Sequence, residues 1–253
     1  MSVHRPHFDA PPLVEAVFDC FVEPNTPMDV ADLEERFFYR FPDYAERTRQ
    51  PWHQFSSSVE IRDGRPSTHP VESQLSGVRR WNADQNRAVL VGPAVLALNI
   101  KPPYGHFEDH LPHLQELVAV FRDFVGPARI LWLGHRYVNH VVLDLDEGQD
   151  PGDLLTLYPR LSKGRALSHP PVAVQVEAGR FEGGSVVTSL VLGAKTAQKV
   201  IYSLDIYART NEQIEFDATR VTLWHSVAHG AIMDAFLETV TPQARARFKE
   251  RTS

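Results

Sequence analysis

The chain has 253 residues and a formal net charge of -6, so it carries no general basic field that would attract a nucleic-acid backbone. Hydrophobic residues make up 43% of it and charged residues 23%, which is typical of a folded globular protein and excludes a disordered or fibrous one. No apolar run approaches the roughly 18 residues that span a bilayer, and the start of the chain lacks the apolar core of a signal peptide. We therefore expect a cytoplasmic protein with no nucleic-acid or membrane partner.

The first expected elements are a strand and a short helix. Apolar residues alternate from Val14 to Val22, which predicts a strand, and the lone cysteine, Cys20, lies on its apolar face and is expected in the core. Apolar residues then recur at helical spacing from Val30 to Phe41. Asp29 can cap the start of this helix and Pro42 can end it.

Strands and a longer helix complete the first part of the chain. Strand-like segments are expected at residues 54–62, 77–82 and 88–100, the last bent at Gly92-Pro93. A helix is predicted from Phe107 to Val125, ended by Gly126. Its apolar stripe predicts that four residues are buried, namely Leu114, Leu117, Val118 and Phe121.

The same order then restarts with a long strand. The remaining expected elements are a strand at 130–144, a short helix at 153–157, strands at 172–177, 185–192 and 199–209, and a helix at 218–240. The pattern predicts an α+β protein in which two similar halves, residues 1–126 and 127–253, each read β-α-β(3-4)-α and form one unit. We expect one curved antiparallel sheet with the helices packed on one face and the other face open for binding; the alternative is a plain sandwich.

Several segments resemble a family of proteins. They are PPLVEAVF near the start, GVRRW, LGHRYVNHVVL at mid-chain and HGAIMDAFLETVTPQARARF near the end. Together they resemble a sporadically distributed family of uncharacterised bacterial proteins, over nearly the whole chain. Gly134, Arg136, Tyr137 and Asn139 fall on the central motif of that family, whereas His135 stands where an aliphatic residue is usual. The resemblance implies a place in accessory gene clusters, such as defence or specialised peptide metabolism.

The standard catalytic motifs are absent from the sequence. There is no GxSxG elbow and no GxGxxG after a strand, and GAKT at Gly193 lacks the spacing of a phosphate loop. We therefore expect no enzymatic activity and no cofactor. His225 and His229, four residues apart on the last helix, could ligate a metal, but no Glu lies between them as in HExxH and the neighbouring stripe is apolar. We expect no bound metal.

Charged and polar residues inside the strands are the most informative. Glu15 lies within VEAVF, and Arg136 and Asn139 lie within LGHRYVNHVVL, where an unpaired buried charge would cost several kcal/mol. Because these segments open the two halves, we expect them side by side, with Arg136 largely buried and paired with Glu15. The alternative is that Arg136 receives a carboxylate of a ligand.

The leading functional expectation is a non-catalytic accessory protein that binds a peptide or protein segment, such as a precursor peptide of a biosynthetic cluster. Its partner would be encoded nearby, and a homodimer is compatible with the sequence. The expected binding residues are Arg136, Tyr137, Asn139, Tyr104, Trp132 and Tyr207. Two alternatives remain: a metal-dependent enzyme that uses His225 and His229, and a carrier that holds a small molecule between sheet and helices.

Overall fold

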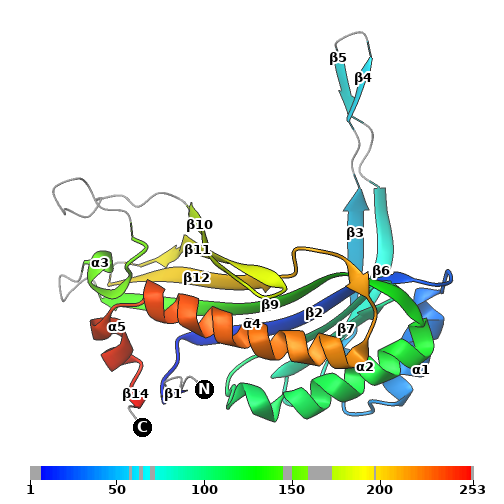
Figure 1. The fold of residues 1–253 in the computed structure, drawn as a ribbon, viewed down its shortest axis with the longest axis horizontal. Helices are drawn as coiled ribbons and strands as arrows, with labels where there is room; N and C mark the ends of the chain where they lie inside the picture. The colour runs from blue at the N-terminus through cyan, green and yellow to red at the C-terminus, as the bar shows by residue number, and fades with distance from the viewer. Residues whose placement is uncertain are drawn as a thin grey trace.

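The computed structural model describes residues 7–56, 59–62, 65–68, 72–144, 150–158, 173–196 and 198–251. It confirms the α+β class: helices pack against a large antiparallel sheet of ten strands (Figure 1). No helix in these ranges is both long and apolar enough to cross a membrane.

The elements before residue 126 are more numerous than the sequence indicates. They are β1 (His7–Phe8), β2 (Leu13–Pro24), α1 (Val30–Tyr39), η1 (Glu46–Thr48), β3 (Gln50–Ser56), β4 (Val59–Arg62), β5 (Arg65–Thr68), β6 (Glu72–Trp81), β7 (Arg87–Gly92), β8 (Val95–Ile100), η2 (Phe107–Asp109) and α2 (Leu111–Val125). The Asp29 side chain caps α1, as predicted, by accepting from two backbone amides. Gly126 ends α2 in the left-handed conformation, with φ 56°.

The remaining elements follow the predicted order closely. They are β9 (Pro127–Asp144), α3 (Pro151–Leu154), β10 (Ala173–Phe181), β11 (Gly184–Lys195), β12 (Lys199–Arg209), β13 (Ile214–Glu215), α4 (Ala218–Thr239), α5 (Pro242–Arg247) and β14 (Glu250–Arg251). The two-stranded pair of β1 and β14 and the short helix α5 are not indicated by the sequence pattern, because elements this short carry too few residues to show a period.

Three expected segments are wrong in detail. Residues 88–100 form a hairpin of β7 and β8 in which Gly92 pairs with Val95, and not one bent strand. Pro93 is the first of the two central residues of this tight turn (position i+1), which suits proline because its ring fixes φ. Helix α2 begins at Leu111, one residue before Pro112, and the residues from Phe107 form a separate 3₁₀ turn. The expected strand over 54–62 divides into β3 and β4, with residues 57 and 58 outside the described ranges.

The opening strands of the two predicted halves lie side by side at the centre of the sheet, as expected. β2 and β9 pair antiparallel, with Val17 opposite Arg136 and Phe21 opposite Trp132. The strand order is β10-β11-β12-β9-β2-β8-β7-β6-β3, with β13 on β9. On each side of the centre, the opening strand pairs with a later strand from the same part of the chain, β2 with β8 and β9 with β12. The division at residue 126 into equivalent halves stays a prediction, because a shared order of strands does not establish equivalence.

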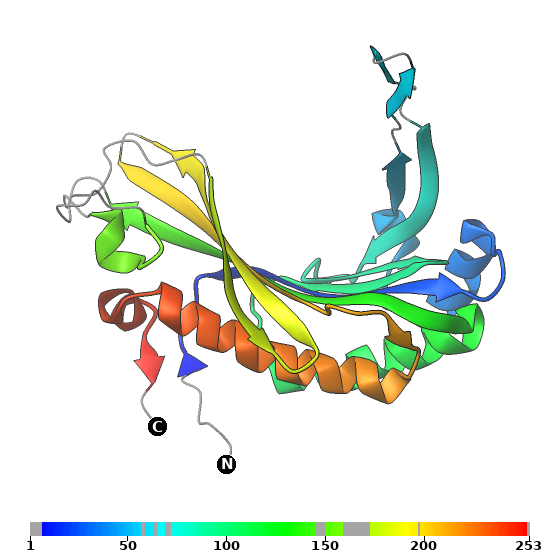
Figure 2. The same cartoon turned by 45° about the horizontal axis from the view of Figure 1, so that its top comes forward.

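The helices α1, α2 and α4 lie on one face of the sheet, which we call the helix face (Figures 1 and 2). Alternation along β2 explains this: Ala16, Phe18, Cys20 and Val22 are buried against the helices. The four predicted core residues of α2 are buried as well, including Leu117 and Phe121. No helix of the described ranges packs on the opposite face, which we call the open face. Figure 2 shows that this face is concave between the β10–β12 end and the rising β3–β6 pair.

Candidate binding sites on the two faces of the sheet

The six residues predicted to bind a ligand divide between the two faces. Because side chains alternate along a strand, neighbouring residues of β9 point to opposite faces. The helix face receives Tyr104, Tyr137 and Asn139, whereas the open face receives Trp132, Arg136 and Tyr207. The sequence motif therefore contains parts of two sites and not one.

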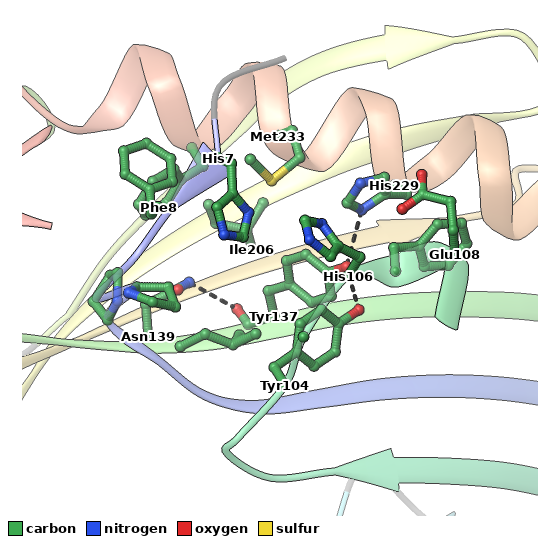
Figure 3. Close-up of a pocket in the computed structure, with 16 residues that line it drawn as sticks. His7, Phe8, Tyr104, His106, Glu108, Tyr137, Asn139, Ile206, His229 and Met233 are labelled. Atoms are coloured by element: carbon green, nitrogen blue, oxygen red, sulfur yellow. Dashed lines mark hydrogen bonds between the residues drawn. The ribbon is translucent and has the colours of Figure 1, made fainter. Parts of the chain in front are cut away.

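The first site is a cavity of about 650 Å³ on the helix face, which we call the helix-side pocket. It is formed by β9, β12, α4, the loop before η2 and the N-terminal segment (Figure 3). The residues that line it are His7, Phe8, Pro11, Pro12, Leu13, Tyr104, Gly105, His106, Phe107, Glu108, Tyr137, Asn139, Ile206, His229, Met233 and Phe236. Figure 3 shows His7, His106 and His229 approaching it from three different elements.

A chain of hydrogen bonds runs along one wall of the helix-side pocket. The hydroxyl of Tyr137 lies 2.7 Å from the hydroxyl of Tyr104 and 2.9 Å from Nδ1 of His229. Burial is the main cause that raises the pKa of both tyrosines above the ordinary value, so both remain neutral phenols. The Tyr137 hydroxyl therefore donates to one neighbour and accepts from the other, and the direction depends on the proton at His229 Nδ1.

A contact with His110 fixes the loop before η2 and holds Tyr104 in place. The backbone oxygen of Tyr104 lies 2.5 Å from Nε2 of the buried His110. Asn139, two residues after Tyr137 on β9, points to the same face and donates to the backbone oxygen of Leu204 over 3.2 Å. These contacts hold the residues of the pocket wall in place.

The histidines beside this pocket are mostly core residues. His135 and His225 are buried, with His135 Nδ1 3.1 Å from the backbone oxygen of His225. Burial lowers the pKa of His225 to about 3 and lowers that of His135 well below its ordinary range. No group of three or more His, Cys, Asp or Glu side chains suited to a metal is found within the described residues. His225 and His229 thus face a core and a pocket wall.

The second site is a hollow of about 520 Å³ on the open face, which we call the open-face hollow. Five strands contribute its lining, which consists of Val17, Asp19, Arg136, Gln175, Ser185, Val187, Ser189, Asp205, Tyr207 and Arg209. The hollow therefore extends from β2 at the centre of the sheet to β10 at its edge. Figure 2 shows that β10–β12 curve upward at this end of the sheet.

The expected pair of Arg136 with Glu15 is wrong. Arg136 is half-exposed and makes a two-pronged contact with Asp205, with Nε to Oδ1 at 2.8 Å and Nη2 to Oδ2 at 2.6 Å. Glu15 instead accepts a hydrogen bond from Asn99 Nδ2 at 2.9 Å. The contact with Asp205 raises the pKa of Arg136, which stays charged.

Asp19 is the unusual residue of the open-face hollow. Its Oδ1 is buried and, among the described residues, has no hydrogen-bond partner. Burial raises the pKa of Asp19 to about 7, although Arg136 opposes this shift. A buried carboxyl with a perturbed pKa in a hollow is a typical mark of a functional site.

An aromatic row extends the open-face hollow along the sheet. It consists of Phe21, Trp52 and Trp132, all partly exposed. The rings of Phe21 and Trp132 stack with centroids 4.2 Å apart, and Trp52 lies 6.4 Å from Phe21. Phe21 and Trp52 also cover a small apolar cluster that consists of Leu90, Val95 and Ala97. The row is therefore a firmly packed surface.

Comparison of the chain with protein-family models, with curated proteins and with solved structures finds no match. The resemblance described from the sequence therefore stays a prediction. What the two sites can do is argued below from their geometry.

Several site residues were not expected from the sequence. Asp19 and Asp205 each stand among apolar residues at the outward positions of a strand, and this was a usable signal. His7, Phe8 and Met233 gave no signal, because their part in the helix-side pocket depends on where the N-terminal segment lies against α4.

Proposed function

We propose that the protein is a non-catalytic binding protein that holds an extended peptide segment on its open face. The observation that supports this most is the line of side chains along the β2–β9 ladder. In register order, Phe21 pairs with Trp132, Asp19 pairs with Gly134, and Val17 pairs with Arg136. Aromatic, acidic and basic groups thus follow one another on a surface that no helix covers.

The spacing of this line suits an extended peptide. Side chains on one face of a strand recur every second residue, about 6.6 to 6.8 Å apart. An extended ligand that lies along the ladder presents its own alternate side chains at the same interval. One side chain can then contact the aromatic row while the next one on that face reaches the open-face hollow.

The side chains at the two ends of this line define the ligand further. Trp132 and Phe21 offer apolar ring surface, which favours an apolar or aromatic side chain. The partly exposed Asp19 carboxyl and the half-exposed pair of Arg136 and Asp205 offer hydrogen-bond acceptors and donors. The expected ligand is a peptide with an apolar residue at one position and a hydrogen-bond donor two positions along, so that both side chains point to the same face. A precursor peptide or partner encoded nearby is the source that the family resemblance favours.

The test is selection from random peptides displayed on phage, with the purified chain as bait. Synthetic versions of the enriched peptides are then titrated by calorimetry against the wild type and two variants. We expect Trp132→Ala and Asp19→Asn each to weaken binding about tenfold, because the first removes the indole ring and the second replaces one carboxyl oxygen by an amide group that cannot accept a hydrogen bond.

The matched control is Leu223→Ala on α4, which removes a large apolar side chain that is 63% exposed and lies away from the open face. This variant is expected to bind the peptides like the wild type. Failure to enrich any peptide, or binding that Trp132→Ala and Asp19→Asn leave unchanged, contradicts the proposal.

A further inference from the structure

The helix-side pocket has a composition that the peptide proposal does not explain. Of the described residues that line it, none is Lys or Arg, and Glu108 is the one carboxylate. Rings make up much of the remaining wall, namely Phe8, Tyr104, Phe107, Tyr137, Phe236 and the imidazoles. The pocket is on the opposite face of the sheet from the proposed peptide site.

We propose that the helix-side pocket is a binding site for a small organic cation, an ammonium group carried on an apolar body. The negative faces of aromatic rings attract cations, and Tyr is among the best side chains for this contact. A single carboxylate at the edge of a ring-lined pocket adds charge attraction without the cost of burying a carboxylate at the bottom.

The charges of the side chains around the pocket favour a cationic ligand over an anionic one. After burial, the negative charge of Glu108 is one of the causes that raise the pKa of Tyr104 and Tyr137, so its field reaches both hydroxyls. An anionic ligand would meet this field with no Lys or Arg among the described lining residues to offset it. A cation is stabilised by the same field.

The size and the apolar residues define the rest of the ligand. A volume of about 650 Å³ lies in the range of small-molecule sites and leaves room for more than an inorganic ion. Ile206, Met233 and Phe236 form the apolar part of the lining. The Tyr104 and Tyr137 hydroxyls each keep a lone pair that can accept a hydrogen bond from a polar group of the ligand.

The test is calorimetric titration of the full chain with four probes of known charge. Choline and benzyltrimethylammonium are the cations, 3,3-dimethylbutan-1-ol is the neutral molecule with the shape of choline, and 3,3-dimethylbutyrate is the anion. We expect both cations to bind, the neutral alcohol to bind about tenfold more weakly than choline, and the anion not to bind.

Two variants locate the binding in the helix-side pocket. Glu108→Gln removes the charge and is expected to weaken the binding of the cations several-fold, without affecting the binding of the alcohol. Tyr104→Leu removes a ring face and is expected to weaken the binding of the cations about tenfold. The controls are Glu116→Gln, which changes an exposed carboxylate on α2, and Tyr39→Leu, which changes a tyrosine that is 85% exposed on α1. Both controls are expected to bind like the wild type.

Three results overturn the proposal: no binding of either cation, an alcohol or anion that binds as well as choline, or cation binding that Glu108→Gln and Tyr104→Leu leave unchanged. Thermal melting of each variant separates lost binding from lost folding. If Tyr104→Leu does not fold, Tyr104→Phe retains the ring and is expected to retain cation binding. The peptide titrations are independent of these results, because Trp132→Ala does not alter the helix-side pocket.

Discussion

The carboxylate of Asp19 occupies the space in which a side chain at Gly134 would stand. The two residues are paired across β2 and β9, and a Cβ built on Gly134 would lie 2.2 Å from Asp19 Oδ1 and 2.5 Å from the hydroxyl of Tyr207. The absence of a side chain at position 134 therefore lets the Asp19 carboxyl and the Tyr207 hydroxyl lie over the centre of the sheet. This close packing is also why Asp19 is buried and has a raised pKa.

Asp19 is expected to make the protein less stable as the pH rises toward neutrality. Its pKa is about 7 in the folded state against 3.8 for an ordinary aspartate, so between these values the folded state holds a proton that the unfolded state has lost. The contribution to the free energy of unfolding is thus present below pH 3.8 and is lost as the pH rises through 7. The slope is at most about 1.4 kcal/mol per pH unit.

Urea unfolding of wild type and Asp19→Asn across this range measures the effect. Asparagine resembles the protonated acid and does not titrate, so the variant is expected to match the wild type near pH 4 and to exceed it by about 1 to 4 kcal/mol near pH 8. The difference between the two proteins removes the contribution of other titrating groups. Parallel curves at all pH values would show that Asp19 has an ordinary pKa.

The ion pair of Arg136 and Asp205 is expected to contribute little to stability. The Arg136 side chain is 46% exposed and that of Asp205 is 23% exposed, so water screens the attraction. Arg136→Ala and Asp205→Ala in a double-mutant cycle should give a coupling energy of about 1 kcal/mol or less. A coupling above about 3 kcal/mol would mean that the pair behaves as a buried one. The pair instead matters for the peptide site, where Arg136→Ala is expected to weaken binding.

The sequence predicted the faces of the sheet well, because alternation in long strands is a strong signal. Of the β2 positions assigned to the apolar face, Ala16, Phe18, Cys20 and Val22 are buried beneath the helices. Val14, the fifth, is only partly buried, and Leu13 is buried in its place, because the pairing with β9 shifts register between Leu13 and Glu15. The adjacency of β2 and β9 was also predicted, since each was identified as an opening strand. These features depend on local pattern, which a single sequence contains.

The partner of Arg136 was not predictable in the same way. Arg136 lies opposite Val17 on β2 and opposite Tyr207 on β12, so Glu15, Asp19 and Asp205 are all diagonal neighbours on the same face. The sequence does not indicate that β12 lies on the other side of β9. Three acidic residues are therefore near Arg136. Glu15 contacts Asn99, and Asp205 is the one that forms the two-pronged pair.

The helix-side pocket was even less predictable from the sequence. Tyr104, Tyr137 and Asn139 were selected as candidates and line this pocket, but they were placed in one site with Arg136, which points to the other face. The pocket is completed by the segment around Phe8, whose position depends on long-range pairing of β1 with β14. No periodic signal reports a contact between two strands of two residues each.

Leu117 is expected to be one of the costliest core residues to truncate. It is fully buried at the centre of α2, among residues that pack between this helix and the sheet. Leu117→Ala should lower the free energy of unfolding by about 2 to 5 kcal/mol, through lost burial and the cavity left behind. Glu116→Ala, at the exposed neighbouring position, should change it by less than about 0.5 kcal/mol. Equal effects of the two variants in urea unfolding would contradict the assigned face of α2.

The buried imidazole of His225 is expected to affect stability in two ways. It should make the protein less stable as the pH falls, and at neutral pH it should leave the fold less stable than an apolar side chain would. Its two ring nitrogens are buried and, among the described residues, neither has a hydrogen-bond partner. Burial places its pKa at about 3 in the folded state against 6.5 for an ordinary histidine, so between these values the unfolded state binds a proton that the folded state does not. The contribution of this residue is thus fully present above pH 6.5 and is lost as the pH falls toward 3.

Replacement of His225 by Leu, a side chain of similar volume, tests both statements. At neutral pH the variant is expected to be as stable as the wild type or about 1 to 2 kcal/mol more stable, because an unsatisfied buried polar group is removed. Between pH 6.5 and 4 the wild type should lose up to about 1.4 kcal/mol per pH unit relative to the variant. His140→Leu, at an exposed position of β9, is the control for the substitution itself and should change the free energy of unfolding at neutral pH by less than about 0.5 kcal/mol. A loss above about 2 kcal/mol for His225→Leu at neutral pH would indicate that the imidazole makes a hydrogen bond that stabilises the fold.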